Sequence, residues 1–596
     1  MRKGSFIYLF VYVFMLFIFN SCRHDWDQVL GKSDDNSATE INGSDADAEN
    51  ETDHEEDADY VWDSSDMISI TLSGSTITTN GDGATIKGST IIITSAGNYR
   101  FSGSLSDGQV VVNTEDTATV RLILDGVNIY NASTAPIFVE NAAKVIIVLA
   151  DDSENYLTDG TLYVFDSSGE DEPNATLFSK DDLTIFGSGS LTIDANYNDG
   201  ITSKDGLIIK SGTINVSAVD DGIRGKDYLV IKDGIITVDA GGDGFKSDND
   251  ADATKGYISV EKGILDITTG ADGIDAQTDV IILYGEFTIN AGGGSSYSAT
   301  TSKKGIKGAV SVIVEDGIFD IESADDAIHS NGNISINGGT FSISSGDDGI
   351  HADSELGIFG GEITISKSYE GIESKIITVD NGNIHITASD DGMNVAGGND
   401  GSGMGGWGDN GTGSSSESYC IYINGGYIYI NSTGDGIDSN GSIVMTGGDV
   451  IVDGPTSSNN GALDYNSSFS ISGGFLVAAG SSGMAQAPGS SSGQYSILVN
   501  LTSTQQANSL FHIQDSEGND ILTLSPSKKY ASVAFSSSEL TNGSSYDIYY
   551  GGSSTGTKTD GRYSGGTYSG GTKYTSFTIS GIVTTVGSSS SGPGGR

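Results

Sequence analysis

The sequence predicts an all-β protein built as a parallel β-helix, with a small antiparallel β unit after it. Three observations lead to this fold class. The 596 residues include 85 glycines and 36% hydrophobic residues, so the chain can bury a large core but has few helix-forming segments. A Gly-Ile step recurs along the chain, most often 22 positions apart, which gives about 22 residues per turn. Short stretches of alternating apolar residues, separated by glycines, fill each interval.

The first 22 residues have the pattern of an export signal. Arg2 and Lys3 precede an apolar run over 6–19 that is short for a membrane span, and Ser21 is a small residue before Cys22. We expect a bacterial lipoprotein signal over 1–22, lipidation at Cys22, and a location at the cell surface or outer membrane. An ordinary signal peptide or an anchor helix is the alternative. Cys420 is the other cysteine, so a structural disulfide is not expected.

The next segment, 23–66, is predicted to be an acidic disordered tether. From 33 to 66 it is rich in Asp, Glu, Asn and Ser, with almost no apolar spacing. The whole chain is acidic as well, with 28 Lys and Arg against 80 Asp and Glu, a net charge of -52. Nucleic acid and anionic lipid surfaces are therefore poor partners, whereas cations and neutral ligands are favoured.

Repeats define residues 67–490 as the β-helix domain. Two early segments, 136–138 and 176–179, fit the repeat loosely. A β-propeller is the competing fold, but its blades of about 40 residues are roughly twice this period. The Gly-Ile step or its equivalent occurs at Gly200, Gly222, Gly244, Gly273, Gly305, Ala327, Gly349, Gly371, Gly392, Gly436, Gly461 and Gly483.

Each repeat is predicted to supply three short strands. In 333–345 (NISINGGTFSISS), Ile334 and Ile336 alternate with polar residues, as do Phe341 and Ile343, and a Gly-Gly pair separates the two segments. The Gly-Ile segment is the third strand. Stacked repeats bury their inward residues as one ladder, which we expect to contain Ile201, Ile223, Phe245, Ile274, Ile306, Ile328, Ile350, Ile372, Met393 and Ile437.

Four insertions interrupt the period and indicate which face binds a ligand. They lie at roughly 155–174, 248–256, 291–302 and 397–417, each just before or after a Gly-Ile strand and never at the Gly-Gly corner. Solenoids tend to place insertions around their binding face. We therefore expect the Gly-Ile face to be the floor of a groove.

Acidic pairs precede the Gly-Ile step in several repeats, as in DDGIRGK from Asp220 and DDGIHAD from Asp347. Equivalent residues of successive turns lie about 4.8 Å apart, so these carboxylates stack and repel one another, by on the order of 1 kcal/mol per pair in water. Calcium would offset the repulsion, because its oxygen ligands lie at about 2.3–2.6 Å. A solvated acidic face rich in Asp-Gly turns is the alternative. The predicted calcium ligands are Asp199, Asp220, Asp221, Asp243, Asp272, Asp325, Asp326, Asp347, Asp348, Asp390 and Asp391.

From about Val120 to Ala485 the chain resembles the bacterial carbohydrate-binding β-helix proteins that are similar to catalytically silent pectate lyases. The resemblance rests on NYNDGITSKD, EDEPNATLFSKDDL, VDDGIRGKDYLVIKDG, SADDAIHSNG, GDDGIHAD and KSYEGIES. It implies a right-handed, surface-located β-helix that holds several calcium ions and binds polygalacturonate and cellulose. The Asp-Asp-Gly-Xaa-Asp pattern of the related lyases is broken at Arg224, His329, His351 and Asn394, whereas Asp275 and Asp438 keep an acid after a single Asp.

One repeat replaces the acidic pair by lysines, in KKGIK from Lys303. Lys303 and Lys304 are predicted to grip a sugar carboxylate or to relieve the repulsion between the Asp residues. If the protein were a calcium-dependent polysaccharide lyase, Lys304 would be its catalytic base. The preferred function is a monomeric surface protein that binds plant-type polysaccharide, and an adhesive or matrix role is a further alternative.

Other side chains are weaker candidates. Trp407, in a glycine-rich insertion that borders the groove, is predicted to stack on a sugar, and Tyr427 and Tyr429 are predicted to point outward from a strand. His329 and His351 stack in successive turns, where surface histidines are favoured over a transition-metal site. Residues 491–596 are predicted to form a C-terminal β cap with a Gly/Ser-rich tail, with an independent sugar-binding module as the alternative.

Overall fold

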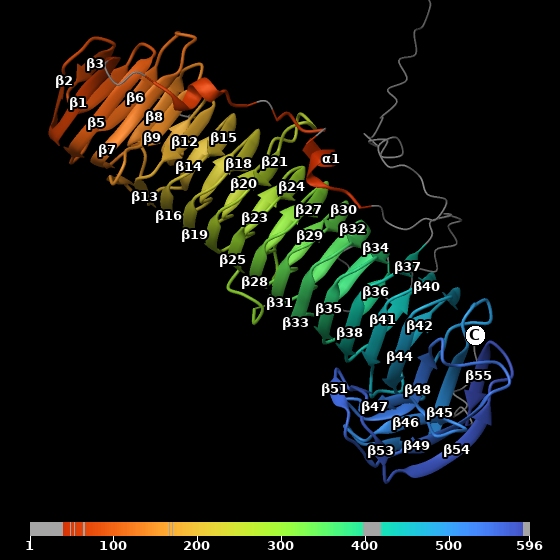
Figure 1. The fold of residues 1–596 in the computed structure, drawn as a ribbon. Helices are drawn as coiled ribbons and strands as arrows, with labels where there is room; N and C mark the ends of the chain where they lie inside the picture. The colour runs from red at the N-terminus through yellow and green to blue at the C-terminus, as the bar shows by residue number, and fades with distance from the viewer. Residues whose placement is uncertain are drawn as a thin grey trace, which may run out of the picture.

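The computed structural model describes residues 40–587 except 48, 53, 63–65, 166, 168, 170, 298 and 397–418. The predicted signal sequence, Cys22 and Trp407 therefore lie outside the described residues. The protein is a long rod of stacked β-strands with a smaller β unit at one end (Figure 1). The predicted fold class, an all-β parallel β-helix followed by a small antiparallel sheet, is confirmed.

Every turn of the rod contributes a strand to each of three faces. The first face carries the Gly-Ile strands, which pair in parallel from turn to turn. Its strands are β4 (Thr90–Ile93), β6 (Gln109–Asn113), β8 (Ile137–Asn141), β11 (Ala175–Ser179), β14 (Asp199–Ser203), β17 (Ile223–Gly225), β20 (Phe245–Ser247), β23 (Ile274–Ala276), β26 (Ile306–Gly308), β29 (Ile328–Ser330), the first parts of β32 (Ile350–Ile358) and β34 (Ile372–Val379), β36 (Met393–Val395), β39 (Ile437–Ser439) and β42 (Leu463–Tyr465).

The second face follows the first within each turn, and β32 and β34 run through the corner between them. Its strands are β9 (Val145–Leu149), β12 (Leu183–Gly187), β15 (Gly206–Ile209), β18 (Tyr228–Ile231), β21 (Tyr257–Val260), β24 (Asp279–Ile282), β27 (Ser311–Val314), β30 (Asn333–Ile336), β37 (Cys420–Ile423), β40 (Ser442–Met445) and β43 (Ser468–Ile471).

The third face closes each turn, and a Gly-Gly or similar corner separates it from the second. Its strands are β10 (Glu154–Asp159), β13 (Ser190–Ala195), β16 (Thr213–Ala218), β19 (Ile235–Ala240), β22 (Ile264–Thr269), β25 (Glu286–Ala291), β28 (Ile318–Ser323), β31 (Thr340–Ser345), β33 (Glu362–Lys367), β35 (Asn383–Ala388), β38 (Tyr427–Ser432), β41 (Asp449–Asp453) and β44 (Phe475–Gly480).

The two ends of the rod are built differently. At the N-terminal end the long strands β1 (Met67–Gly74), β5 (Gly97–Leu105) and β7 (Val120–Asn131) pair in parallel, and β2 (Thr76–Thr79) and β3 (Ala84–Lys87) add antiparallel pairings to β1 and β4. At the other end β48 (Tyr530–Ser536) pairs antiparallel with β44, and β45 (Ser496–Gln505) and β55 (Val583–Val586) follow.

The C-terminal unit also contains a separate antiparallel sheet of six strands among the described residues. Its own hydrophobic cluster includes Ile451, Phe511 and Val533, and thus joins β41 of the rod to the C-terminal strands. The strands are β51 (Thr557–Thr559), β52 (Arg562–Ser564), β47 (Asp520–Leu524), β46 (Phe511–Asp515), β49 (Ser545–Tyr550) and β54 (Thr572–Thr578), and β50 (Ser553–Ser554) pairs with β53 (Tyr568–Ser569).

The core is a set of side-chain ladders inside the rod. All ten residues of the predicted inward ladder are 0% exposed and occupy equivalent positions, as in the pairs Ile201 with Ile223 and Ile328 with Ile350. Phenylalanines stack in the same way from Phe287 to Phe319 to Phe341. The alignment at Gly461 was wrong by one position, because Ile437 pairs with Leu463 and the longer connection before β42 absorbs the extra residue.

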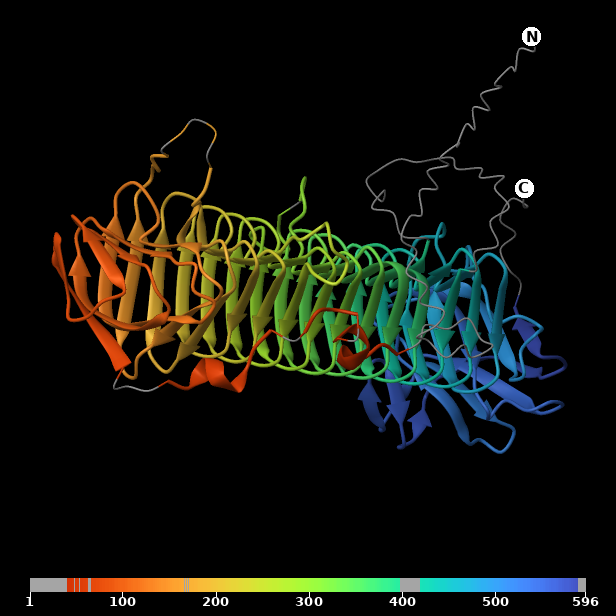
Figure 2. The ribbon, with the colours of Figure 1, turned by 90° about the horizontal axis from the view of Figure 1, so that it is seen from above.

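The N-terminal segment differs from the predicted disordered tether where it is described. Residues 40–62 run along the second face, shown in red in Figures 1 and 2, and include α1 (Gly43–Asp47) and the 3₁₀ helix η2 (Asp57–Tyr60). Ile41 packs against the second face, and the His54 ring stacks 3.6 Å from the ring of Tyr228. The few apolar and aromatic residues of this segment therefore have partners on the rod. The acidic composition of the segment gave no sign of these contacts. Among the described residues, none forms a helix long and apolar enough to cross a membrane.

Three of the four predicted insertions flank the first face, and the fourth, 397–417, lies outside the described residues. Residues 160–174 and 291–302 precede β11 and β26, while 248–256 follows β20. Loops project along this margin in Figure 2. The first insertion starts later than expected, because 154–159 forms β10 and belongs to the third face.

Candidate functional site

A column of charged residues runs along one edge of the first face, two positions before each inward isoleucine. The strand register places these residues in equivalent positions in successive turns. Most are buried; Asp199, Asp272, Asp326 and Asp348 are each 2% exposed or less. In order, the column consists of Asp199, Asp221, Asp243, Asp272, Lys304, Asp326, Asp348, Glu370, Asp391 and Asp435.

These aspartates have a structural role that the sequence did not reveal. The backbone N–H of one column residue donates a hydrogen bond to the Oδ1 of the aspartate one turn earlier, because no backbone acceptor faces it at this corner. The N–O distance is 3.0 Å from Asp243 to Asp221, 2.9 Å from Asp272 to Asp243, and 3.0 Å from Asp348 to Asp326. One oxygen of each of these carboxylates is thus used by the fold, and the second oxygen of Asp243 and of Asp326 faces a cationic or imidazole partner.

In the N-terminal part of the column, lysines supply the cations. Lys246 Nζ lies 2.6 Å from Asp243 Oδ2 and 3.2 Å from Asp221 Oδ2. Lys307 Nζ lies 2.9 Å from Asp275 Oδ1. Although burial opposes it, these carboxylates raise the pKa of both lysines, so the ammonium forms persist. The chain's own lysines therefore offset much of the repulsion that the sequence interpretation assigned to calcium.

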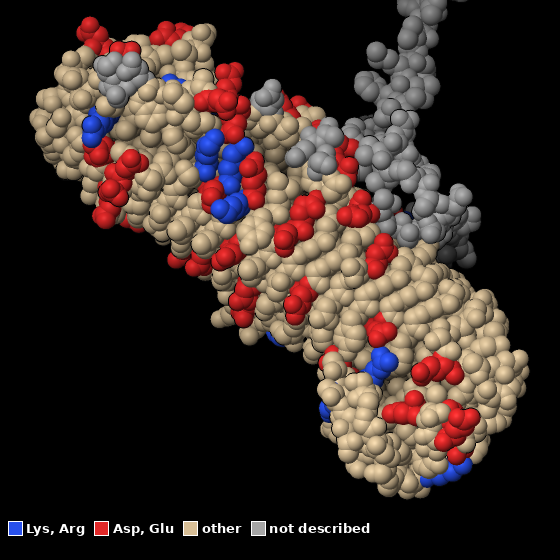
Figure 3. Space-filling model, viewed as in Figure 1, with Lys and Arg blue, Asp and Glu red and all other residues tan. Residues whose placement is uncertain are grey.

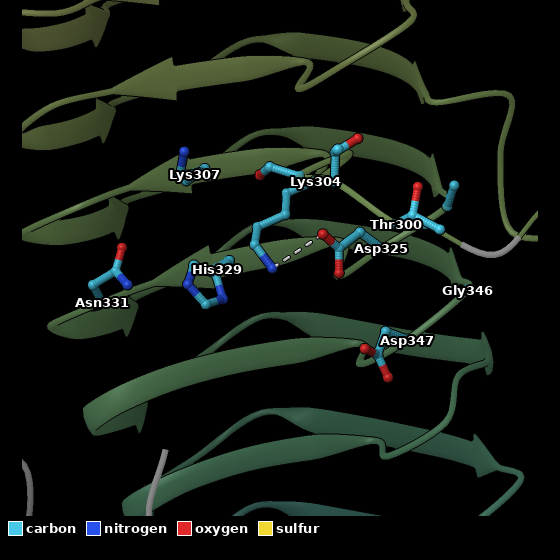
Figure 4. A pocket seen from close by; sticks show the side chains of 12 residues that line it. Thr300, Lys304, Lys307, Asp325, His329, Asn331, Gly346 and Asp347 are labelled. Carbon is cyan, nitrogen blue, oxygen red and sulfur yellow. Dashed lines mark ion pairs between the residues drawn. The ribbon is translucent and has the colours of Figure 1, made fainter. Parts of the chain in front are cut away.

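Lys304 is the most buried of these lysines, with 5% of its surface exposed. Its Nζ lies 2.6 Å from Asp326 Oδ2. It also lies 3.3 Å from Asp325 Oδ2, the ion pair drawn in Figure 4. Lys303 precedes it on the more exposed side, and its backbone N–H bonds to Asp325 Oδ2. The Lys304 ammonium thus reduces the electrostatic repulsion between the carboxylates of the Asp column, and two of these carboxylates stabilise its charged form.

A hollow of about 630 Å³ opens on the first face beside Lys304. Residues 299–302 at the end of one insertion provide one wall, and β26 and β29 with the corners before them provide the floor. Figure 4 shows charged and amide side chains converging on this space. The polar lining includes Thr300, Ser302, Lys304, Lys307, Asp325, His329, Asn331 and Asp347.

The C-terminal part of the column has acids without lysines. Carboxylate oxygens of Asp391, Asp435 and Asp438 lie within 4.8 Å of one another. No basic side chain of the described residues forms an ion pair with them. Burial, followed by the neighbouring acids, raises the pKa of Asp391 to about 8, of Asp435 to about 6 and of Asp438 to about 7. The raised pKa values are expected where neighbouring carboxylates have no cation between them.

Side chains that could hold a metal ion gather in five groups among the described residues. Seven predicted ligands belong to them, whereas Asp199, Asp220, Asp221 and Asp390 belong to none. The sequence prediction missed Asp435 and Glu373. A signal was present, because the DGID segment has an acid just before its Gly-Ile pair and the YEGIES segment has one just after it. The groups are Asp326/His329/His351, Asp348/His351/Glu373, Asp243/Asp272/Asp275, Asp325/Asp326/Asp347 and Asp391/Asp435/Asp438.

Tyr427 and Tyr429 point outward, as predicted, but they do not face solvent. Both pack against the hydrophobic cluster of the C-terminal unit. Tyr427 donates a hydrogen bond to Asp560 Oδ2 at 2.7 Å, and Tyr429 donates one to Asp453 Oδ2 at 3.0 Å. The C-terminal unit covers this part of the third face, so the two rings contribute to its docking.

The distribution of charged side chains differs between the sides of the rod. On the side seen in Figure 3, acidic side chains are spread along the rod, and basic side chains gather in a few patches. In the first-face column, lysines compensate the acids of the N-terminal turns, whereas the acids of the C-terminal turns have no lysine among the described residues. A cation or a charged ligand would therefore find distinct sites along one groove.

Comparison with known proteins agrees with these features. The family of carbohydrate-binding domain-containing proteins matches residues 87–349 and 347–487. A carbohydrate-binding domain-containing protein of Acetivibrio thermocellus is 44% identical over 139 residues, which are 23% of this chain and 49% of that protein. This chain therefore spans about half the length of that relative.

A solved structure is also similar, the polysaccharide lyase-like protein from C. thermocellum in its gadolinium derivative. It shares 30% identity and a TM-score of 0.36, over 49% of this chain and 96% of that one. The family match extends over well more than half of the chain. The protein thus belongs to the family of carbohydrate-binding domain-containing proteins.

Proposed function

We propose that the protein captures plant-type polysaccharide, polygalacturonate or cellulose, in the first-face groove, with calcium bound at Asp391, Asp435 and Asp438. Family membership implies a polysaccharide ligand. The hollow beside Lys304 supports the position of the ligand, because its wall is an insertion and its lining is rich in hydrogen-bonding groups. Hydroxyl-rich sugars need such donors and acceptors.

The parallel stacking of the first face suits a linear polymer. Each turn repeats the same strand about 4.8 Å further along the rod, so a chain lying in the groove meets similar groups again and again. Lys307 and Asn331 line the hollow as donors, and Asp325 and Asp347 as acceptors. A protein with a net charge of -52 repels a polyanion. Bound cations would therefore decide the affinity for polygalacturonate.

Calcium is proposed for the cluster of Asp391, Asp435 and Asp438, because the cluster offers oxygen ligands only. Oxygens within 4.8 Å of one another can each reach an ion that binds at about 2.3–2.6 Å. At Asp325, Asp326 and Asp347 the ammonium of Lys304 is already in place. Calcium would thus bind most strongly where the chain supplies no lysine.

Binding without lysis is proposed over the lyase alternative. A catalytic base must be able to lose its proton near the operating pH. The Lys304 ammonium instead lies within ion-pair distance of two carboxylates in a buried position. The adhesive or matrix role makes the same use of the groove. We further propose that Cys22 anchors a monomeric protein at the bacterial surface.

A bulky substitution in the hollow tests the position of the ligand. Thr300→Trp should fill it and reduce retention on polygalacturonate and cellulose, because Thr300 is exposed and lines the cavity wall. Thr387→Trp is the matched control on the exposed third face. Retention is measured by affinity electrophoresis. If Thr300→Trp is retained as strongly as the wild type and Thr387→Trp, the ligand binds elsewhere.

A further inference from the structure

We propose that Asp348, His351 and Glu373 form a site for a first-row transition-metal dication such as Zn²⁺, distinct from the all-oxygen calcium cluster. Asp348 and His351 come from the turn of β32, and Glu373 from β34 in the next turn, directly opposite His351 in the strand register. The three side chains are buried, at 2%, 1% and 8% exposure.

The distances from His351 to the two carboxylates fit ligands of one small ion. His351 Nδ1 lies 3.5 Å from Asp348 Oδ2 and 3.9 Å from Glu373 Oε2. All three donor atoms lie within 4.8 Å of one another. Zinc binds imidazole nitrogen and carboxylate oxygen at about 2.0–2.2 Å, so two ligands of one ion are separated by at most about 4.2 Å. Both distances from Nδ1 fall below this limit.

The other ring nitrogen supplies an independent observation. His351 Nε2 lies 3.5 Å from Asp353 Oδ1, whose side chain is 29% exposed at the rim. A histidine ligand typically presents its second nitrogen to a carboxylate, which fixes the tautomer and raises the basicity of the coordinating atom. His351 thus has two carboxylate oxygens near its Nδ1 that could share an ion with it, and the Asp353 carboxylate within ion-pair distance of its Nε2.

Acidic side chains surround the proposed site. Asp326 Oδ2 is 3.7 Å from His351 Nδ1, but it is already paired with Lys304 and His329. One turn further, Asn394 Nδ2 bonds to Glu370, and the Asn394 Oδ1 is buried without a hydrogen-bond partner among the described residues.

The donor set favours a transition metal over calcium. Imidazole suits Zn²⁺ and its neighbours in the first row, whereas calcium takes six to eight oxygen ligands. Three protein ligands would leave a position open to water or to an oxygen of a bound sugar. Because the ligands come from consecutive turns, the ion would also tie β32 to β34 on the groove floor.

Cobalt(II) titration of the chelator-stripped full chain tests the site, because Co²⁺ bound through nitrogen absorbs visible light. We expect a spectrum that saturates at one equivalent, persists in excess calcium, and disappears in His351→Gln. Asp353→Asn should weaken Co²⁺ binding by about 10- to 100-fold, as loss of an orienting carboxylate does. His385→Gln, which removes an imidazole bonded to Asp560, is the control that keeps the spectrum.

Three results would overturn the proposal. They are the absence of a visible spectrum in the wild type, an unchanged spectrum in His351→Gln, and displacement of Co²⁺ by an equal concentration of calcium. If circular dichroism shows that His351→Gln loses its β structure, Glu373→Gln decides, since it keeps the histidine and the side-chain volume. A full-strength Co²⁺ spectrum in Glu373→Gln likewise contradicts the site.

Discussion

Replacing Lys304 by methionine removes the cation that the structure places inside the acidic column. Asp326, 1% exposed, would keep His329 Nδ1 at 2.9 Å but lose the ammonium at 2.6 Å. Breaking a buried ion pair from one side costs about 3–5 kcal/mol, and the remaining His329 contact favours the lower end, about 3 kcal/mol. We expect this loss as a lower urea midpoint in chelator.

Calcium should partly reverse the effect of Lys304→Met, because Asp325, Asp326 and Asp347 would then form an all-oxygen cluster without an ammonium. Lys303→Met is the matched control, since it removes a neighbouring charge whose side chain forms no ion pair among the described residues. Equal urea midpoints for the two variants in chelator would refute the assignment of Lys304 as the internal counter-ion of the column.

Three further predictions follow from the site. Calorimetry of the chelated protein should show stability falling as pH rises from about 4 to 8. The pKa values of Asp391 (about 8), Asp435 (about 6) and Asp438 (about 7) lie above the unfolded value of 3.8, so folding favours the protonated forms, and calcium should reduce this dependence. Constant stability over this range would contradict it. Tyr427→Phe should lower the free energy of unfolding of the C-terminal unit by about 1.5 kcal/mol, because its hydroxyl bonds to a carboxylate. An unchanged melting midpoint would show that the bond contributes little. Polygalacturonate with calcium at alkaline pH should give no rise in unsaturated-product absorbance, and a rise that Lys304→Ala abolishes would identify a lyase.

The repeat pattern was sufficient to predict the fold because periodic burial leaves a periodic sequence. The inward ladder from Ile201 to Ile437 follows directly from the Gly-Ile step, and the insertions bordering the first face follow from its interruptions. The register failed at Gly461, where a longer connection shifts the chain by one residue without a change in composition.

The site was harder to predict because its electrostatics depend on contacts between turns. The sequence identified the Asp column and the exceptional Lys304, but it did not reveal that backbone N–H groups use one oxygen of each Asp. It did not distinguish turns where lysines reach the column from those where none does. Packing of Tyr427 under the C-terminal unit, and of Ile41 on the second face, likewise joins segments far apart in the chain.

Retention on polygalacturonate and on cellulose, each with calcium and with chelator, tests the central claim most directly. We expect polygalacturonate retention to fall strongly when calcium is chelated. A protein with a net charge of -52 repels a polyanion unless cations lie between them. Cellulose retention should change little, and Asp435→Asn in calcium should behave as the chelated wild type does. Equal retention of both polysaccharides without calcium would contradict a calcium-bearing carbohydrate-binding face.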